Sequence, residues 1–342
     1  MSAAHTADGL GQSSNNRQEE SPQESSSSAA HLESKEVDDR EEPWKAHFGA
    51  LKPEAKAFVV SNKERSYEPT LAVVASRRDF SEMPQDVKAS FEYLRWTDLY
   101  KSVKPYAILG EVPDGLPETN MEFRAASAER IEDVRDREHM FSLEQQGFAI
   151  KKSAMPLSSF DADAVEREYP GYVEKIVREL VESNAEVLMF DWRLRTSNRN
   201  NSAFRPGKEY DPNNRGMYIN PVRTVHIDQS ADGAVKRVRH HLAERADRLM
   251  EGRFRVLNLW RPLRHPVQDY PLAVCDATTI SSDLLVKAAY IREDYHGESL
   301  YPLQSDQYTW YYLSNQRSDE ILVFKSYDSS ASAKARCTLP ST

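Results

Sequence analysis

The sequence has few cysteines and no long apolar run, and each shortage excludes a class of protein. Its 342 residues include two cysteines, Cys275 and Cys337. Two cysteines cannot build a disulfide framework or a zinc-finger ligand set, so we interpret both as reduced thiols of a cytoplasmic protein. No stretch approaches the roughly 18 apolar residues that a membrane-spanning helix needs. The first residues are polar and lack the apolar centre of a secretory signal, so we expect no export.

Positive charge and glycine are also in short supply. The chain carries 45 Lys and Arg against 54 Asp and Glu, a formal net charge of −9 at pH 7. A general nucleic-acid binder has a basic face, whereas these basic residues are dispersed apart from a cluster at 236–240. The 12 glycines form no strand-turn-helix loop for S-adenosylmethionine, which argues against a methyltransferase. We expect neither a nucleic acid nor a membrane as partner, and the sequence leaves the oligomeric state open.

The chain divides into a polar tail and one long folded region. Residues 1–42 are rich in Ser, Glu, Gln and Asn and nearly free of large apolar side chains. Such a segment cannot bury enough surface to offset its ordering entropy, so we predict that 1–42 is disordered. We predict a single domain over 43–342, with an N-terminal α/β part at 43–215 and a β-rich part at 216–342.

Hydrophobic periodicity predicts where helices and strands lie. Residues 160–183 predict an amphipathic helix, residues 234–250 a basic helix, and the apolar residues of 84–105 have roughly helical spacing. Strands are predicted at 131–136, from 148, and at 185–193, 253–262, 270–276, 308–313, 320–327 and 335–339. The pair 308–313 and 320–327 predicts a hairpin, and 198–214 a loop able to cover a site. A run of short strands favours a sandwich, barrel or jelly roll.

One triplet in the extended run 221–230 carries candidate chemistry. His226 and Asp228 are two positions apart, and residues i and i+2 of a strand point to the same face. Val225 and Ile227 would point to the opposite face. An imidazole beside a carboxylate supplies two ligands of a 2-His-1-carboxylate site, which binds Fe(II) and leaves positions open. A lone His-x-Asp is weak evidence, because such pairs are common in surface turns.

The other histidines do not supply an obvious third ligand. His240 and His241 lie on the predicted basic helix, where adjacent side chains point about 100° apart and cannot easily bind one metal. His265 lies in a proline-flanked loop and His296 in a Tyr-His-Gly-Glu turn, so we expect both at the surface. The candidate metal site therefore lacks an identified third ligand.

Several motifs, each weak alone, together resemble a known family. They lie at 133–135, 141–143, 147–148, 225–230 (Val-His-Ile-Asp-Gln-Ser), 256–263 (Val-Leu-Asn-Leu-Trp-Arg-Pro-Leu), 269–276 (Asp-Tyr-Pro-Leu-Ala-Val-Cys-Asp), 310–313 and 323–329. As a set they resemble the fungal asaB-type hydroxylase/desaturase family, which includes gibberellin desaturase. The resemblance extends over residues 44–338.

The resemblance implies an oxidoreductase with an α+β fold, a double-stranded β-helix (jelly-roll) core with flanking helices. Such enzymes use non-haem Fe(II) and 2-oxoglutarate to hydroxylate, desaturate or cyclise small molecules of fungal secondary metabolism. The family's proximal ligands fall on His226 and Asp228, which we expect to be the metal ligands and catalytic residues. Arg255, Asn258 and Tyr312 are candidates for cofactor contacts, with structural hydrogen bonds as the alternative.

The end of the sequence departs from the family pattern. Relatives carry a second histidine after the Phe-Lys-x-Tyr-Asp-Ser motif and then an arginine that would pair with 2-oxoglutarate. Here residues 336–342 read Arg-Cys-Thr-Leu-Pro-Ser-Thr, and Pro340 stands at the place of the histidine. Proline has no ligating side chain. We therefore predict that the catalytic part, 216–342, is truncated, and the alternative to an enzyme is a non-catalytic paralogue without these groups.

Overall fold

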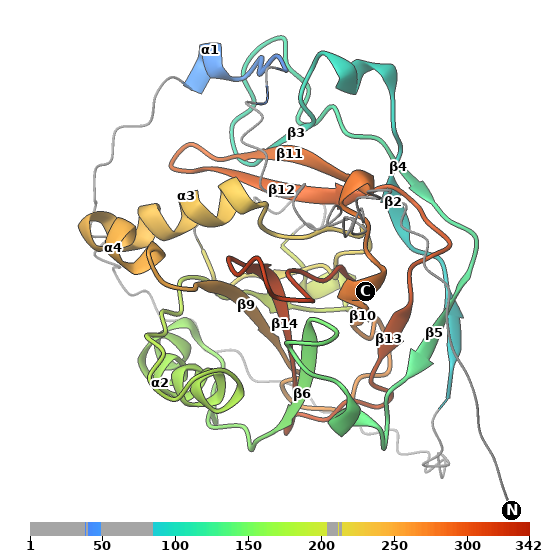
Figure 1. Cartoon of the computed structure of the whole chain (residues 1–342), viewed down its shortest axis with the longest axis vertical. Helices are drawn as coiled ribbons and strands as arrows, with labels where there is room; N and C mark the ends of the chain where they lie inside the picture. Colours follow the sequence, from blue (N-terminus) through green and yellow to red (C-terminus); the bar gives the residue numbers. More distant parts are fainter. Residues whose placement is uncertain (1–37, 39, 49–84, 204–210, 212–213) are drawn as a thin grey trace, which may run out of the picture. The chain divides into compact units, whose positions relative to one another are not determined.

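Short strands in small, curled sheets form most of the regular structure (Figure 1). The computed structural model describes residues 38, 40–48, 85–203, 211 and 214–342. The largest sheet contains, in spatial order, β1 (Val87–Ala89), β5 (Glu129–Asp133), β13 (Trp310–Tyr312), β10 (Ala273–Cys275) and β15 (Pro340–Ser341). Strands β5 and β13 are parallel, whereas the other neighbours are antiparallel. The sheet thus joins segments that are far apart in the sequence.

The remaining strands form two three-stranded sheets and two strand pairs. One sheet contains β6 (Phe148–Lys152), β14 (Glu320–Asp328) and β9 (Arg255–Trp260), in that order. The other contains β12 (His296–Pro302), β11 (Leu285–Ile291) and β3 (Tyr106–Ile108). The pairs are β2 (Glu92–Leu94) with β4 (Phe123–Ala125) and β7 (Leu194–Arg195) with β8 (Tyr218–Ile219).

Helix α2 (Ala162–Leu180) confirms the amphipathic helix predicted at 160–183. Its N-terminus is capped by Asp161, whose side chain accepts a hydrogen bond from the Ala164 amide at 2.8 Å. Its apolar face, which includes Ile176, packs against β6, β14 and the Leu257 and Leu259 side chains of β9. Burial of this face holds the helix, because an isolated helix of this length is only marginally stable in water.

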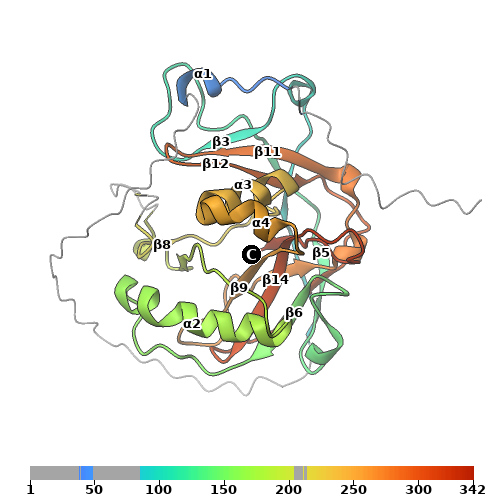
Figure 2. The ribbon, with the colours of Figure 1, turned by 60° about the vertical axis from the view of Figure 1, so that its left-hand side comes forward.

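The basic helix predicted at 234–250 is divided into two. Helix α3 (Ala231–Leu242) begins earlier, because the Ser230 side chain caps it by accepting from the Gly233 amide at 2.9 Å. It ends where Ala243 adopts a φ of +42°, and a short 3₁₀ turn leads into α4 (Ala246–Met250). Helix α3 lies along β12 (Figure 2), and a side chain at Gly233 would collide with the Glu298 carbonyl oxygen.

Several predicted elements are wrong. The predicted hairpin does not form, because β13 pairs with β5 and β10 whereas β14 pairs with β6 and β9. Residues 185–193 form no strand, and 84–105 form β1, β2 and a 3₁₀ turn, Asp98–Lys101, in place of a helix. Residues 335–339 form no strand, and the short β15 begins only at Pro340. Conversely, the antiparallel pair β11–β12 was not predicted, and it places His296 on a strand.

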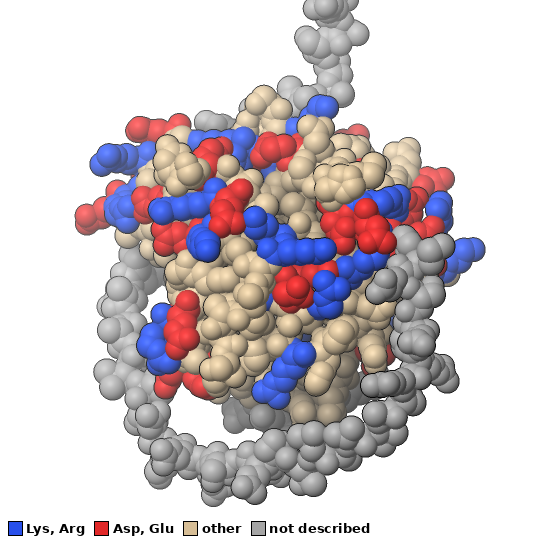
Figure 3. Space-filling model, turned by 90° about the horizontal axis from the view of Figure 1, so that it is seen from below, with Lys and Arg blue, Asp and Glu red and all other residues tan. Residues whose placement is uncertain are grey.

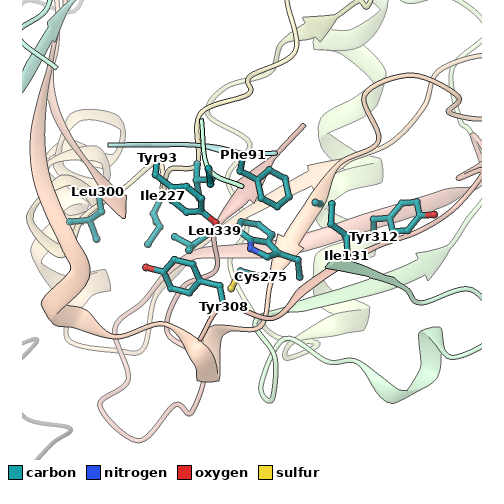
Figure 4. Close-up of a cluster of buried hydrophobic side chains, with 13 residues drawn as sticks. Phe91, Tyr93, Ile131, Ile227, Cys275, Leu300, Tyr308, Tyr312 and Leu339 are labelled. Atoms are coloured by element: carbon teal, nitrogen blue, oxygen red, sulfur yellow. The ribbon is translucent and has the colours of Figure 1, made fainter. Parts of the chain in front are cut away.

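A buried cluster lies directly behind the His-x-Asp segment. Val225 and Ile227 are fully buried in it, among aromatic side chains and Cys275 and Leu300 (Figure 4). The bridge between Ile227 and Leu300, with N–O distances of 2.8 and 2.9 Å, fixes the segment to β12. This burial confirms the prediction that Val225 and Ile227 point away from the face that carries His226 and Asp228.

The predicted tail falls largely outside the described residues, as do 49–84 and most of the predicted loop at 198–214. Its last residues, however, make contacts: Asp38 lies 3.1 Å from the Lys104 ammonium, and the Glu41 amide donates to the Ser102 carbonyl at 2.7 Å. All described residues belong to one compact unit. On the face shown in Figure 3, acidic and basic side chains are intermixed. No helix among the described residues is long and apolar enough to cross a membrane.

Candidate functional site

His226 and Asp228 converge at the wall of a cavity. His226 Nε2 lies 3.3 Å from Asp228 Oδ1, and the two side chains are 17% and 41% exposed. The cavity has a volume of about 2390 Å³ and is lined by α2, β9, α3 and the segment 184–197, among other parts. His226 and Asp228 point to the same side because they are two positions apart in an extended segment, and the intervening Ile227 is buried on the other side.

Hydrogen bonds orient both groups. The Thr224 carbonyl accepts from His226 Nδ1 at 2.9 Å, so Nδ1 carries a proton and Nε2 is the ring nitrogen that faces Asp228. On the carboxylate, Oδ2 accepts from Asn258 Nδ2 at 2.6 Å and from the Ser326 hydroxyl at 3.3 Å. Asp228 Oδ1 therefore faces His226 while Oδ2 is held by β9 and β14. This is the arrangement in which outer partners fix the direction of metal-binding groups.

The electrostatics favour a charged carboxylate. Burial opposes the charge of Asp228, but hydrogen bonds from His226 and Asn258 outweigh it and lower the pKa of the carboxyl to about 2. Burial also opposes a charge on His226, yet the neighbouring carboxylate raises the pKa of that imidazole. Arg195, on β7, lies near enough to act on both pKa values.

The segment after Asp228 is anchored by a buried ion pair. The Glu298 carboxylate on β12 accepts from the Ser230 hydroxyl at 2.5 Å and from the Lys104 ammonium at 2.6 Å. The Ser299 hydroxyl donates to the Asp228 carbonyl at 3.0 Å. Lys104 and Glu298 are 5% and 4% exposed, so the pair holds the turn between Asp228 and α3 from inside the protein.

The other predicted site residues lie in different surroundings. Asn258 contacts Asp228, as described above. Arg255 lines the cavity but donates two 2.8 Å hydrogen bonds to the Glu182 carboxylate, on the other face of β9. The Tyr312 hydroxyl donates to the Gln85 carbonyl at 2.5 Å within the buried cluster. Of the three, the structure brings only Asn258 to the His226–Asp228 pair.

None of the four histidines weighed as a third ligand, His240, His241, His265 and His296, joins the pair. His240 and His241 contact each other edge to face on α3, with ring centroids 4.8 Å apart. His265 lines the cavity, and the Nε2 atom of His296 is buried on β12 without a hydrogen-bond partner. Within the described ranges, no group of three or more His, Cys, Asp or Glu residues could hold a metal ion. In the described part of the chain, His226 and Asp228 therefore have no third His, Cys, Asp or Glu grouped with them.

The last residues of the sequence reach the same cavity. Pro340 pairs with Val274 at the edge of the largest sheet, where a residue without an N–H is tolerated. The Thr342 amide donates to the Val222 carbonyl at 3.0 Å, so this segment runs beside the one that leads to His226. Residues 340–342 all line the cavity. The position at which the resemblance places a second histidine thus lies next to the strand of the first.

Sequence reasoning missed Ser326, Ser299 and the Lys104–Glu298 pair. Their contacts with the site join positions 68 or more residues apart, such as the Ser230–Glu298 bond. The local signal is that Ser326 is a polar residue in the buried strand β14, where Glu320, Lys325 and Asp328 are also buried. A polar residue inside a buried strand needs a partner, which points to a polar site beside it.

An imidazole and a carboxylate are ligands that Fe(II) accepts. Nδ1 of His226 is engaged by the Thr224 carbonyl, which leaves Nε2 as the nitrogen able to face a metal, and the low pKa of Asp228 keeps its carboxylate in the form that binds metal. The two side chains thus fit iron as two of its protein ligands.

Comparisons with known proteins agree with this chemistry. Residues 91–342 match a family profile described as oxidoreductase/YMDC permease-like domain. The chain is 33% identical over 208 residues to the Fe(II)/2-oxoglutarate-dependent dioxygenase nvfI of Aspergillus novofumigatus, spanning 58% of this chain and 69% of that protein. It is 32% identical over 219 residues to the hydroxylase/desaturase efuI of Hormonema carpetanum, spanning 60% of this chain and 73% of that protein.

A solved structure shows the same fold. The iron and alpha-ketoglutarate-dependent endoperoxidase NvfI superposes with a TM-score of 0.63 and 26% identity over 75% of this chain and 89% of that one. The profile covers more than half of the chain, and both relatives are matched over more than two thirds of their length. The chain therefore belongs to this oxidoreductase family, that of the fungal Fe(II)/2-oxoglutarate-dependent dioxygenases and hydroxylase/desaturases.

Proposed function

We propose that His226 and Asp228 hold the Fe(II) of an oxygenase that hydroxylates or desaturates a small molecule of fungal secondary metabolism. The observation that carries this proposal is the 3.3 Å approach of His226 Nε2 to Asp228 Oδ1 at the cavity wall. Membership of the family supplies the reaction type, and the two oriented side chains supply a place for it.

When bound, iron with 2-oxoglutarate and O₂ supplies the oxidising power of such an enzyme. The protein's own groups have simpler tasks. Asp228 contributes the negative charge, while the Asn258 amide and Ser326 hydroxyl keep its second oxygen turned away from His226. The Thr224 carbonyl holds the imidazole in the tautomer that can ligate.

Arg195 is our candidate for the cation that receives the far carboxylate of 2-oxoglutarate. Arg195 lines the same cavity as the His226–Asp228 pair. Its charge influences both pKa values. Arginine suits this task because its planar fork matches a carboxylate.

We also infer that the curled sheets form a double-stranded β-helix core. Three observations support this: the segment 222–228 runs beside β12 and β15, β15 pairs with β10, and β10 pairs with β13. The sheet of β9, β14 and β6 carries Asn258 and Ser326 toward the same site. Two sheets would then face each other across the proposed ligands.

Turnover of 2-oxoglutarate tests the proposed function. The purified chain is supplied with Fe(II), 2-oxoglutarate, ascorbate and O₂, and succinate is measured, because oxygenases of this class form some succinate even without substrate. We expect succinate formation that a chelator abolishes, and that is lost in His226→Ala and Asp228→Ala. The exposed Asp98→Ala serves as a control that keeps activity. Metal-independent succinate formation, or full activity in His226→Ala, contradicts the proposal.

A further inference from the structure

A second group of polar side chains lies in the cavity, away from His226 and Asp228. On α3, the Arg237 guanidinium carbon lies 3.9 Å from the centroid of the Tyr295 ring and 5.4 Å from that of Phe190. His241, one turn further along α3, packs against Phe190 with ring centroids 5.2 Å apart. These four residues line the cavity. They form a cationic and aromatic pocket, which we call the Arg237 pocket.

Several polar atoms of this pocket are buried without a hydrogen-bond partner. They are Arg237 Nε, His241 Nε2 and the Tyr295 hydroxyl, and Trp192 Nε1, from a residue that lines the same cavity, is a fourth such atom. Buried polar groups in proteins are nearly always hydrogen-bonded, because an unmet donor loses its bonds to water. Four such atoms among the residues that line one cavity indicate a ligand that supplies their partners. Three of them, on arginine, tyrosine and tryptophan, are donors, so the ligand must present acceptor oxygens.

The positive charge of Arg237 has no carboxylate partner among the described residues and is therefore available to pair with an anionic ligand. Arg237 makes no ion pair with any carboxylate in the described part of the chain, and its guanidinium lies over the rings of Tyr295 and Phe190. Two carboxylates of the cavity wall are engaged elsewhere: Asp191 lies 3.4 Å from Arg215, and Asp294 lies 3.1 Å from Arg292. Burial, followed by the charges around it, lowers the pKa of His241 to about 4. The imidazole is therefore neutral at pH 7, and the pocket keeps one uncompensated positive charge.

The position of the pocket separates it from the metal site. The Ser299 hydroxyl donates to the Asp228 carbonyl, so Ser299 is the residue of β12 that lies beside the proposed ligands. Tyr295 lies four residues earlier, just before β12 begins, and at ~3.3 Å per residue this is a distance of about 13 Å. A molecule of 2-oxoglutarate held at the metal by its 2-oxo end is shorter than this. The two sites nevertheless open into one cavity.

We propose that the Arg237 pocket binds a carboxylate of the substrate, so that the enzyme oxidises an organic acid held at one end by Arg237. The inference rests on the proposed function, because it places the substrate's reacting carbon at the His226–Asp228 pair. A guanidinium binds a carboxylate through two parallel hydrogen bonds. The rings of Phe190 and Tyr295 then pack against the adjoining carbon skeleton. The substrate class is an extended, partly apolar carboxylic acid.

Matched probes test the pocket. Benzoate and benzamide share one ring and differ in charge, so their dissociation constants for the Mn(II)-loaded full chain are compared by calorimetry. We expect benzoate to bind wild type at least about 10-fold more tightly than benzamide, because a charged pair adds to the shared ring contact. Arg237→Gln should remove this preference, Arg237→Lys should keep part of it, and Tyr295→Phe should weaken benzoate more than benzamide. The exposed Arg239→Gln, on the same helix, should leave it unchanged.

The arms of the experiment separate this inference from the proposed function. Arg237→Gln should bind Mn(II) and 2-oxoglutarate as wild type does, and His226→Ala should lose metal binding while it keeps the benzoate preference. No saturable benzoate binding, or an equal preference in Arg237→Gln, overturns the inference. Weakened 2-oxoglutarate binding in Arg237→Gln also overturns it, because the carboxylate would then be that of the co-substrate. If Arg237→Gln does not fold, Tyr295→Phe provides the test. Unchanged benzoate binding in Tyr295→Phe contradicts the proposal that the Arg237 pocket binds the carboxylate.

Discussion

The side-chain amide of Asn258 donates a 2.6 Å hydrogen bond to Oδ2 of Asp228 and a 3.0 Å hydrogen bond to the Ser326 hydroxyl. One amide group thus links β9, β14 and the segment that carries both proposed ligands. The bond is charge-assisted, and it fixes which carboxylate oxygen faces His226. Asn258 is therefore a positioning residue for the proposed metal site.

Replacing Asn258 by alanine should weaken iron binding. Partners of metal ligands contribute about 10- to 100-fold in affinity, because they hold the ligand in its binding orientation. We expect Asn258→Ala to raise the Fe(II) dissociation constant by this factor, measured by anaerobic titration, with little change in melting temperature. The exposed Asn184→Ala, on the cavity wall, is the matched control. Wild-type iron affinity in Asn258→Ala would show that the hydrogen bond does not position the carboxylate.

Breaking the Lys104–Glu298 pair should destabilise the fold. Removing one partner of a buried ion pair leaves an uncompensated charge, at a cost of about 3–5 kcal/mol. We expect this loss in the free energy of unfolding of Lys104→Met, measured by urea denaturation, and a smaller additional loss when Glu298→Gln is combined with it. The exposed Lys101–Asp98 pair is the control, and Lys101→Met should cost less than about 1 kcal/mol. Additive losses in the double variant would contradict a direct coupling.

Asp328 should make stability depend on pH in the acidic range. Burial opposes its charge, but hydrogen bonds from Arg253 and Lys325 outweigh it and lower the pKa from 3.8 to about 2. A carboxyl with a lowered folded-state pKa stabilises the protein above its unfolded pKa, and this stability is lost as pH falls from about 4 to about 2. The contribution is about 2 kcal/mol.

Comparison with Asp328→Asn tests this dependence. The difference in unfolding free energy between wild type and variant should narrow as pH falls through that window, because protonated Asp328 and asparagine are both uncharged. A constant difference from pH 5 to pH 2 would assign the stabilisation to packing and not to the charge of Asp328.

Both thiols should be unreactive in the folded protein. Burial raises the pKa of Cys275 to about 12 and that of Cys337 to about 11, and only the thiolate attacks alkylating reagents. We expect native protein at pH 7.5 to resist iodoacetamide, and the unfolded chain to incorporate two labels, counted by mass spectrometry. Rapid native labelling of Cys275 would contradict its burial in the core cluster.

Local pattern predicted the parts of the fold that local physics determines. The period of two in Val225–Asp228 gave the correct faces, because Ile227 is buried while His226 and Asp228 line the cavity. The 3.6-residue period identified α2, whose buried face follows it. On β9, Leu257 and Leu259 pack toward α2 while Asn258 reaches Asp228 from the opposite face, which is the period of two expected of a strand.

Pairing over long distances could not be predicted from the sequence. The loop between β13 and β14 is short enough for a hairpin, yet β13 pairs in parallel with β5, about 180 positions away. The Asn258–Asp228 bond spans 30 positions and leaves no local trace. Arg255, predicted as a cofactor contact, lies on the face of β9 opposite Asn258, and the Glu182 carboxylate takes its charge. The family resemblance supplied the chemistry that spacing alone left open.

Binding of Fe(II) and 2-oxoglutarate tests the assignment of His226 and Asp228 most directly. Under anaerobic conditions, addition of both to the purified chain should produce the weak metal-to-ligand charge-transfer absorbance of their complex. We predict that the band appears in wild type and in the control His240→Ala, whose imidazole lies on α3. It should be absent in folded His226→Ala. A band of wild-type intensity in His226→Ala would contradict the assignment and place the iron elsewhere.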